Sequence, residues 1–287
     1  MSGNLLLPGC REREWEVGDG FERHGSGLWL PPGDEHEDGY STVPPLEQQP
    51  LGIDLFAGAG GFSCGFKTAG WHVVAASDGW ATAAVTYLCN LGGPHTVVHL
   101  VGDELPEGTK RETAWHAEHR GEAVSATEFF EVCHAKVGDK ELAPGEGWIA
   151  NEAGVQPCEH FYLGDVRALT GEQILDDLEL TGDDIGCVFG GPPCQGFSRA
   201  GQRKTDDPRN ELVFEFMRIV CEIHPHAFMM ENVPGIMDMV THDGIPVIDA
   251  IVRIAEDGGM GTFKAVRQSL AGTAGVGAAL LAMETVE

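Results

Sequence analysis

The chain has 287 residues, and its 42% of hydrophobic residues is a globular composition that excludes wholesale disorder. Its 18 basic residues stand against 45 acidic ones, and the net charge of −27 excludes a protein that coats nucleic acid through bulk positive charge. No apolar run approaches the roughly 18–20 residues that a membrane span needs, so we expect no membrane partner.

Residues 1–50 carry ten acidic and three basic residues and are rich in glycine and proline. This composition favours an acidic arm with little regular structure. The eight cysteines of the whole chain are scattered and form no CxxC pair, which indicates reduced thiols in a cytoplasmic protein. The spacing of Cys133-His134 and of Cys158 with His160 lacks the tight pairs of structural zinc sites, so we expect no metal.

From residue 51 onward, apolar strands alternate with helices. Strands are predicted from residue 51 and over 72–78, 160–166, 184–191 and 226–233, and helices over 81–90, 210–225 and 246–257. This alternation predicts an α/β fold with a mainly parallel sheet. Residues 92–158 are acidic with few apolar runs and are interpreted as an insertion.

The first strand ends in a glycine-rich loop, and the second strand ends at Asp78. Gly58 and Gly60 fit the first two glycines of a dinucleotide-binding loop, but position 63 is Ser. An acid 18 residues after Gly60 is suited to accept hydrogen bonds from ribose hydroxyls. The pattern indicates an adenosine-type ligand. The alternative is a glycine turn that only closes a strand–helix unit.

Four motifs that follow one another in the chain complete this pattern. They are DLFAGAGGFSCGF (54–66), GPPCQGFSRAG (191–201), DPRNEL (207–212) and ENV (231–233). Together they resemble the cytosine-5 DNA methyltransferase family, which uses S-adenosyl-L-methionine. The resemblance implies a doubly wound sheet of the S-adenosylmethionine-dependent methyltransferase type.

The resemblance also implies which residues bind this cofactor. Asp78 would bind the ribose, Asp165 the adenine amine, and the glycine loop the methionine part, with Gly102-Asp103 as the alternative to Asp165. Phe56 would stack near the adenine, and Trp80 is a second candidate for that stacking. The implied cofactor-binding residues are Phe56, Ala57, Gly58, Ala59, Gly60, Gly61, Asp78, Asp165 and Pro193.

By the same resemblance, Cys194 is the nucleophile that adds to C6 of cytosine, because C5 alone is a poor nucleophile. Glu231 would protonate or hydrogen-bond N3 of the base, Asn232 would hold two loops together, and Arg209 would anchor the loop after the thiol. The implied partner is DNA with a flipped cytosine. Residues 199–209, with four basic and two acidic side chains, suit phosphate contact.

Only 54 residues follow Val233, and they carry no QxRxR motif and no segment long enough for a target-recognition domain. We therefore expect residues 51–287 to form a catalytic domain that is incomplete at its C-terminus and lacks target recognition. Three hypotheses follow: a truncated or split DNA methyltransferase that depends on a second polypeptide, a tRNA cytosine-5 methyltransferase, or an inactive cofactor-binding remnant.

Overall fold

The computed structural model divides the chain into two compact units, Met1–Ser41 and Thr42–Glu287. It describes residues 22–23, 29–30, 49–147, 156–193, 212–238 and 245–256. In the first unit, the described residues form a pair of two-residue antiparallel strands, β1 (Glu22–Arg23) and β2 (Trp29–Leu30). This pairing is regular structure that the composition of residues 1–50 does not predict.

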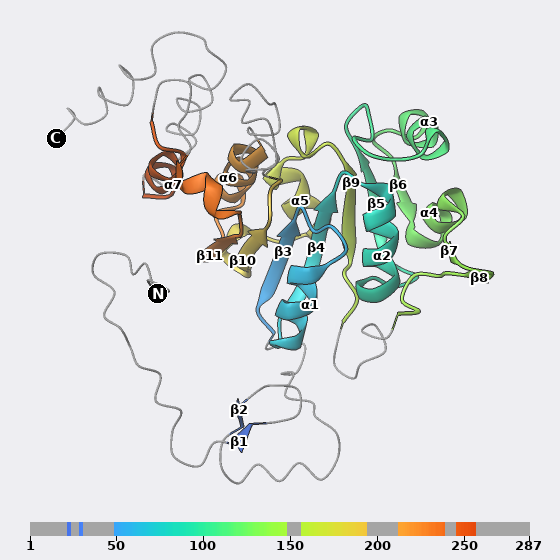
Figure 1. The fold of residues 1–287 in the computed structure, drawn as a ribbon, viewed down its shortest axis with the longest axis horizontal. Coiled ribbons are helices and arrows are strands. Elements are labelled where there is room, and N and C mark those ends of the chain that lie inside the picture. The colour runs from blue at the N-terminus through green and yellow to red at the C-terminus, as the bar shows by residue number, and fades with distance from the viewer. Residues whose placement is uncertain are drawn as a thin grey trace, which may run out of the picture. The chain divides into compact units, whose positions relative to one another are not determined.

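The second unit is built on a seven-stranded sheet in the order β11-β10-β3-β4-β9-β5-β6 (Figure 1). All neighbouring pairs are parallel except β5 with β6. The strands are β3 (Leu51–Leu55), β4 (His72–Asp78), β5 (Val97–Val101), β6 (Ala123–Ser125), β9 (His160–Gly164), β10 (Ile185–Gly190) and β11 (Ala227–Met230).

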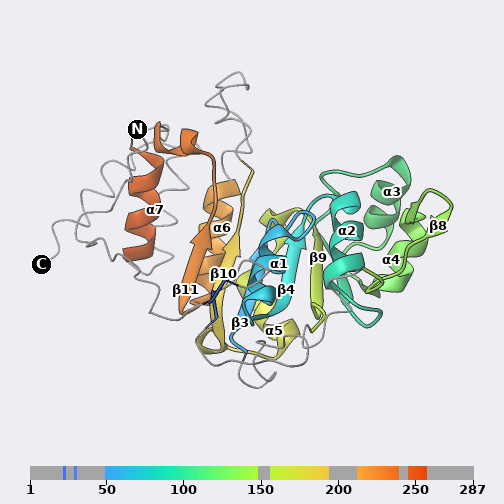
Figure 2. The same ribbon diagram turned by 60° about the horizontal axis from the view of Figure 1, so that its bottom comes forward.

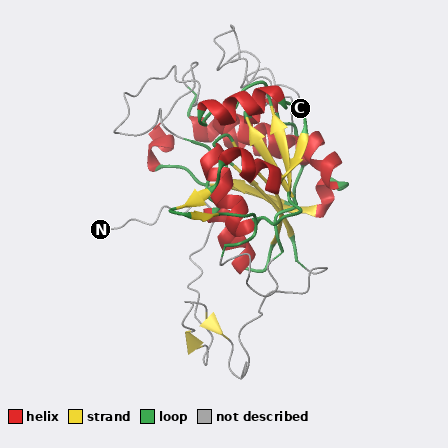
Figure 3. Ribbon diagram, turned by 90° about the vertical axis from the view of Figure 1, so that its right-hand side faces the viewer, coloured by secondary structure: helices red, strands yellow, loops and turns green. Residues whose placement is uncertain are grey.

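Helices cover both faces of this sheet, so the described part of the unit has three layers (Figure 3). The helices are α1 (Gly61–Thr68), α2 (Ala81–Leu91), α3 (Lys110–Glu118), α4 (Ala126–Cys133), α5 (Gly171–Leu178), α6 (Leu212–Ile223) and α7 (Val247–Glu256). Short 3₁₀ turns are η3 (Val166–Ala168), η4 (Gly182–Asp184) and η6 (Pro234–Asp238), and a small hairpin joins β7 (Lys136–Val137) to β8 (Lys140–Glu141).

The central strands are mostly apolar because both of their faces are buried, and the polar Asp54 and Ser77 within them are buried as well. On β9, Phe161 and Leu163 pack with α2 and α4, whereas Tyr162 between them belongs to the cluster formed with α5, α6 and α7. Each of these three side chains is at most 1% exposed. The period-two alternation therefore distributes one strand between two separate cores.

Helix α6 confirms the helix that the apolar repeat predicts over 210–225. Val213, Phe216, Met217 and Val220 are all buried against the sheet. The remaining predicted strands and helices of the main sheet are also observed, with ends that differ by a few residues. None of the helices in the described ranges combines the length and apolar character that a bilayer crossing requires.

The segment interpreted as an insertion, 92–158, contributes two strands to the seven-stranded sheet, β5 and β6, which its acidic sequence does not predict. Strand β5 pairs in parallel with β9 along its whole length, and β6 pairs antiparallel with β5 at the edge. Helices α3 and α4 lie at the same end of the sheet, beyond α2 (Figure 2). The segment thus extends the main sheet rather than forming a separate lobe.

The order of the strands reverses next to β3. On one side of β3 the sheet continues with β4, β9, β5 and β6, whereas β10 and β11, which come last in the chain, lie on the other side. The carboxyl ends of β3, β4, β9 and β10 all point to the same edge because the strands are parallel. In open α/β sheets, ligands bind outside the carboxyl ends at such a reversal.

The glycine loop offers a sharp test of packing at this edge. Gly60 has φ of 98°, and a Cβ added there would lie 2.1 Å from Leu91 Cδ1 and 3.0 Å from Tyr87 Cδ2. We expect Gly60→Ala to lower the free energy of unfolding by about 1–3 kcal/mol, measured by urea denaturation. Gly61→Ala is the matched control: Gly61 begins α1, and a Cβ there meets nothing within 4 Å, so equal losses in both variants would contradict the close packing at Gly60.

Candidate functional site

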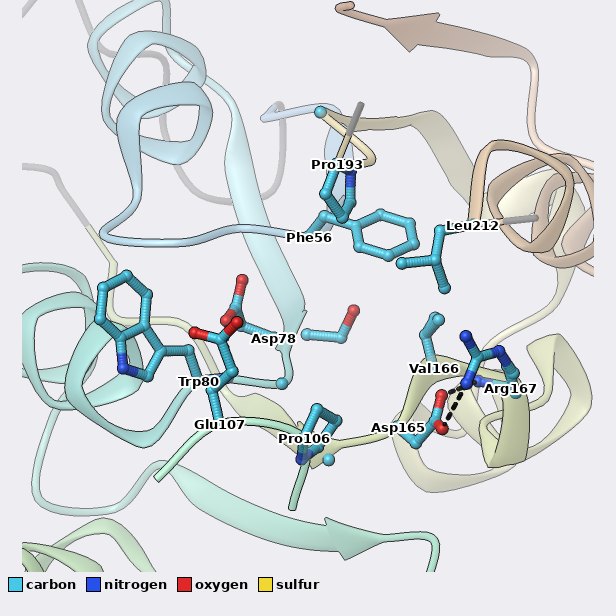
Figure 4. A pocket seen from close by; sticks show the side chains of 14 residues that line it. Phe56, Asp78, Trp80, Pro106, Glu107, Asp165, Val166, Arg167, Pro193 and Leu212 are labelled. Carbon is cyan, nitrogen blue, oxygen red and sulfur yellow. Dashed lines mark hydrogen bonds and ion pairs between the residues drawn. The ribbon is translucent and has the colours of Figure 1, made fainter. Parts of the chain in front are cut away.

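A pocket of about 370 Å³ opens at the carboxyl edge of the sheet, where the strand order reverses (Figure 4). This volume lies in the range of small-molecule binding pockets. The strand ends supply its floor, and the segment after β5 supplies part of its rim. It is lined by Phe56, Ser77, Asp78, Gly79, Trp80, Pro106, Glu107, Gly164, Asp165, Val166, Arg167, Gly191, Pro193 and Leu212.

The loop from Phe56 to Gly61 turns so tightly that three of its residues adopt positive φ. Phe56 has φ of 59°, Gly58 of 54° and Gly60 of 98°. The Phe56 side chain faces Leu212 across the pocket (Figure 4). A Cβ added at Gly58 or Gly61 would meet nothing within 4 Å. The predicted cofactor residues Ala57, Gly58, Ala59, Gly60 and Gly61 do not line this pocket, and Gly61 borders a separate hollow with Phe62 and Trp71.

Asp54 lies beneath this loop and is 0% exposed. Its Oδ2 accepts hydrogen bonds from the backbone N of Ser63 at 3.1 Å and from Ser63 Oγ at 2.6 Å. The Ser63 hydroxyl also lies 2.8 Å from that of Tyr87 on α2. Burial raises the pKa of Asp54 to about 7, against the lowering effect of the Ser63 hydrogen bonds. Asp54 Oδ1 has no hydrogen-bond partner among the described residues.

Asp78 is the last residue of β4 and lines the pocket. It also holds the glycine loop by a hydrogen bond. Its Oδ2 accepts from the backbone N of Gly58 at 2.8 Å, and its Oδ1 accepts from the backbone N of Trp80 at 2.8 Å. Burial raises its pKa in spite of these hydrogen bonds. Trp80 also lines the pocket and is 49% exposed, so its ring offers an apolar face to a ligand.

Asp165 follows β9 and lies across the pocket from Trp80 (Figure 4). It caps η3 by accepting from Arg167 N at 3.0 Å, and its Oδ2 pairs with Arg167 Nη1 at 3.0 Å. Asp103, the alternative to Asp165 in the sequence, does not line the pocket. Its side chain is 86% exposed and pairs with Arg120 at 3.2 Å. Of the two alternatives, the geometry brings only Asp165 to the pocket.

Two of the residues that the resemblance assigns to catalysis, Glu231 and Asn232, lie beside the segment after β10 that borders the pocket. Gly191 and Pro193 line it after β10. Glu231 follows β11, and its exposed carboxylate lies over Gly191, since a Cβ there would be 3.4 Å from Glu231 Oε2. Asn232 Nδ2 donates to the carbonyl of Pro192 at 3.1 Å and so ties the two strand ends together.

Cys194 and Arg209 lie outside the described residues, as does the basic stretch 199–209. Cys194 directly follows Pro193, which lines the pocket, in the chain. Within the described ranges, no group of three or more histidine, cysteine or acidic side chains is arranged to hold a metal ion.

Sequence reasoning missed several residues that line the pocket, and four of them come from two segments. Pro106 and Glu107 come from the inserted segment, and Val166 and Arg167 follow Asp165. No motif marks Pro106 or Glu107, because they reach the pocket through pairing with a distant part of the chain. Arg167 could have been suspected from its position two residues after a site aspartate.

The profile of the family described as C-5 cytosine-specific DNA methylase matches residues 52–103 and 156–251. The chain belongs to this family. The two matched stretches leave out residues 104–155, which include α3, β6, α4 and the β7–β8 hairpin. The matched stretches include Phe56, Asp78, Asp165, Pro193 and Glu231.

Individual relatives are type II methyltransferases. The chain is 31% identical to M.XorII of Xanthomonas oryzae over 66% of its own length and 29% of that of the relative. It is 30% identical to M.DdeI of Desulfomicrobium norvegicum over 69% of its length and 31% of that of the relative. Against M.AquIA of Picosynechococcus it is 47% identical over 76 residues, 26% of this chain and 31% of the relative. The chain thus spans about 30% of the length of these curated relatives.

The buried carboxyl of Asp54 predicts a pH dependence of stability. Its pKa of about 7 in the folded chain exceeds the ordinary value of 3.8. The folded chain therefore holds a proton that the unfolded chain has released between about pH 4 and pH 7. The stabilisation is complete below about pH 4 and is lost as the pH rises through about 7.

Because Asp54→Asn cannot ionise, the stability of the wild type relative to this variant should fall between pH 5 and pH 8. We expect a change of roughly 2–4 kcal/mol, measured by urea denaturation of both proteins at the two pH values. Asp103→Asn removes an exposed acidic side chain and is the control. A wild-type advantage that stays constant across this range would contradict the assignment.

Proposed function

We propose that the described pocket binds S-adenosyl-L-methionine and that the chain contains the catalytic centre of a DNA cytosine-5 methyltransferase. The observation that carries the proposal is the convergence of Phe56, Asp78, Asp165 and Pro193 on one pocket. These residues come from four segments of the chain and are four of the nine that the family resemblance assigns to the cofactor. The other five, Ala57, Gly58, Ala59, Gly60 and Gly61, do not line the pocket. The family model concerns DNA rather than RNA, which favours DNA over the tRNA alternative.

The donors and acceptors around the pocket fit this cofactor. Asp78 presents carboxylate oxygens to a ribose, Asp165 presents an acceptor for an exocyclic amine, and Trp80 offers an aromatic face to a base. Gly58 does not line the pocket but is joined to it through Asp78, and a Cβ there would meet nothing within 4 Å, so the methionine part can approach the backbone at Gly58 closely. When bound, the cofactor supplies an electrophilic methyl group.

The proposed nucleophile is Cys194, one residue beyond Pro193. Its thiolate adds to C6 of cytosine and forms an S–C6 bond, which makes C5 an enamine carbon. With the cofactor bound, C5 would take its methyl group as the bond from that methyl to sulfur breaks and S-adenosylhomocysteine is left. The proton on C5 would then leave to a base, and the electron pair of that C–H bond would expel the thiolate. Pro192 and Pro193 restrict the backbone before the thiol.

Glu231 is the proposed acid for N3 of the base, since protonation there makes C6 more electrophilic. Its carboxylate lies over Gly191, three residues before Cys194. The hydrogen bond from Asn232 to the Pro192 carbonyl supports this arrangement, because it joins the segment that carries the acid to the segment that carries the thiol. In the proposal, the carboxyl of Glu231 and the thiol of Cys194 then act on the same pyrimidine ring.

The proposed substrate is a cytosine turned out of the duplex, because C5 and C6 cannot be reached while the base is stacked. Residues 199–209 supply the local positive charge for phosphate contact in a chain of net charge −27. Dependence on a second polypeptide stays a prediction. It is tested by measuring tritiated methyl transfer to DNA with and without the product of the neighbouring gene.

The cofactor assignment predicts that the isolated chain binds S-adenosylhomocysteine, the demethylated product, in titration calorimetry. Asp78→Ala should weaken binding by roughly 1–3 kcal/mol, because it leaves ribose hydroxyls unpaired and releases Gly58. Asp103→Ala, at an exposed carboxylate outside the pocket, should bind like the wild type. A folded wild-type chain that does not bind at millimolar ligand would contradict the assignment.

The nucleophile assignment predicts that Cys194→Ala abolishes methyl transfer while binding of S-adenosylhomocysteine persists. DNA that contains 5-fluorocytosine should form a covalent adduct, because fluorine at C5 cannot leave as a proton does. Peptide mapping should place this adduct at Cys194. An adduct at Cys64 or at the buried Cys187 would overturn the assignment, and Glu231→Gln should slow transfer strongly because its amide cannot protonate N3.

A further inference from the structure

The segment that the family profile leaves unmatched supplies one wall of the pocket. Pro106 and Glu107 follow β5, and both line the pocket beside Asp78. Leu105, immediately before them, is 5% exposed and packs in the core around α2. The buried Leu105 therefore fixes the chain just before Pro106 and Glu107.

Glu107 is also fixed to the backbone of the β4–α2 connection. Its N–H donates to the carbonyl of Gly79 at 3.0 Å, and its own carbonyl accepts from the N of Ala81 at 3.1 Å. These bonds form a parallel bridge between Trp80 and Glu107. The approach is close enough that a Cβ at Gly79 would lie 3.0 Å from Pro106 Cγ. Glu107 thus has a set position relative to Asp78.

Asp78 and Glu107 differ in how much of each carboxylate is already engaged. Both oxygens of Asp78 accept a backbone N–H, from Gly58 and from Trp80. The exposed carboxylate of Glu107 makes no hydrogen bond or ion pair with any residue that the structure describes. Figure 4 shows the two carboxylates beside each other on the pocket wall, and Glu107 is one of the charges that raise the pKa of Asp78.

Two neighbouring carboxylates repel each other unless a ligand supplies donors to both. A vicinal diol has two O–H groups and matches this pair. Asp78 keeps one acceptor site on each oxygen after its backbone bonds, whereas Glu107 keeps all of its acceptor capacity. The pair therefore offers more acceptor capacity to a diol than Asp78 does alone.

We propose that Glu107 is a second ribose-binding carboxylate, which accepts a hydrogen bond from one hydroxyl of the cofactor diol while Asp78 accepts from the other. This inference rests on the proposed function of the pocket and deepens it. It makes the inserted segment part of the cofactor site and gives this chain a contact that lies outside the stretches matched by its family.

The test is calorimetric titration of the full chain with S-adenosylhomocysteine and with its 2′,3′-dideoxy form. Glu107→Gln should weaken binding of S-adenosylhomocysteine about tenfold, because a charged acceptor becomes a neutral one. The same substitution should leave binding of the dideoxy ligand unchanged within about twofold. Glu104→Gln is the matched control, since Glu104 is an exposed acid in the same segment that does not line the pocket.

The outcomes separate this inference from the function on which it rests. If the folded wild type does not bind S-adenosylhomocysteine, the proposed function fails and the inference fails with it. If the wild type binds and Glu107→Gln binds equally well, only the inference is overturned. A loss of the same size with both ligands would also overturn it, because the carboxylate would then act without the diol. Melting temperatures of the variants verify that each is folded.

Discussion

The turn after β3 is held by two carboxylates that accept backbone hydrogen bonds, one from the loop itself and one from the first turn of α1. Asp54 binds the N–H of Ser63 from below, and Asp78 binds the N–H of Gly58 from the neighbouring strand. Asp78 can reach the loop because β3 and β4 are adjacent and parallel. The position of Phe56, the space above the glycines and the start of α1 all follow from these two attachments.

The same helix that begins at this loop also fixes the end of the inserted segment. Lys67, near the end of α1, is 2% exposed and donates to the carbonyl of Gln156. Burial lowers the pKa of Lys67 to about 8, while the nearby Cys158 and Glu159 oppose that shift. Since β9 begins at His160, this contact lies just before the strand that Asp165 follows. The buried Lys67 therefore ties α1, which begins at the glycine loop, to the chain that enters β9.

The sequence predicts strands β3, β4, β9, β10 and β11 because each is a mostly apolar run, whether it is buried on both faces like β10 or exposed at the edge like β11. It does not predict β5, because Val97–Val101 is a five-residue run inside an acidic segment and its partner β9 lies about 60 residues later in the chain. The residues of the site likewise divide into those that a local sequence pattern marks and those that it does not. Asp78 and Asp165 can be predicted since each ends a recognisable strand, whereas Glu107 reaches the pocket through a bridge to Trp80 that no local pattern encodes.

The backbone of Phe56 carries a further consequence. A residue with a Cβ at φ of 59° is strained, by about 1–2 kcal/mol relative to the right-handed region, and glycine would relieve that strain. The fold therefore keeps an aromatic ring on the pocket wall at a position where backbone energetics alone would select glycine. Variants chosen only for thermal resistance should drift toward glycine here and lose ligand affinity, so stability and binding are opposed at this single residue.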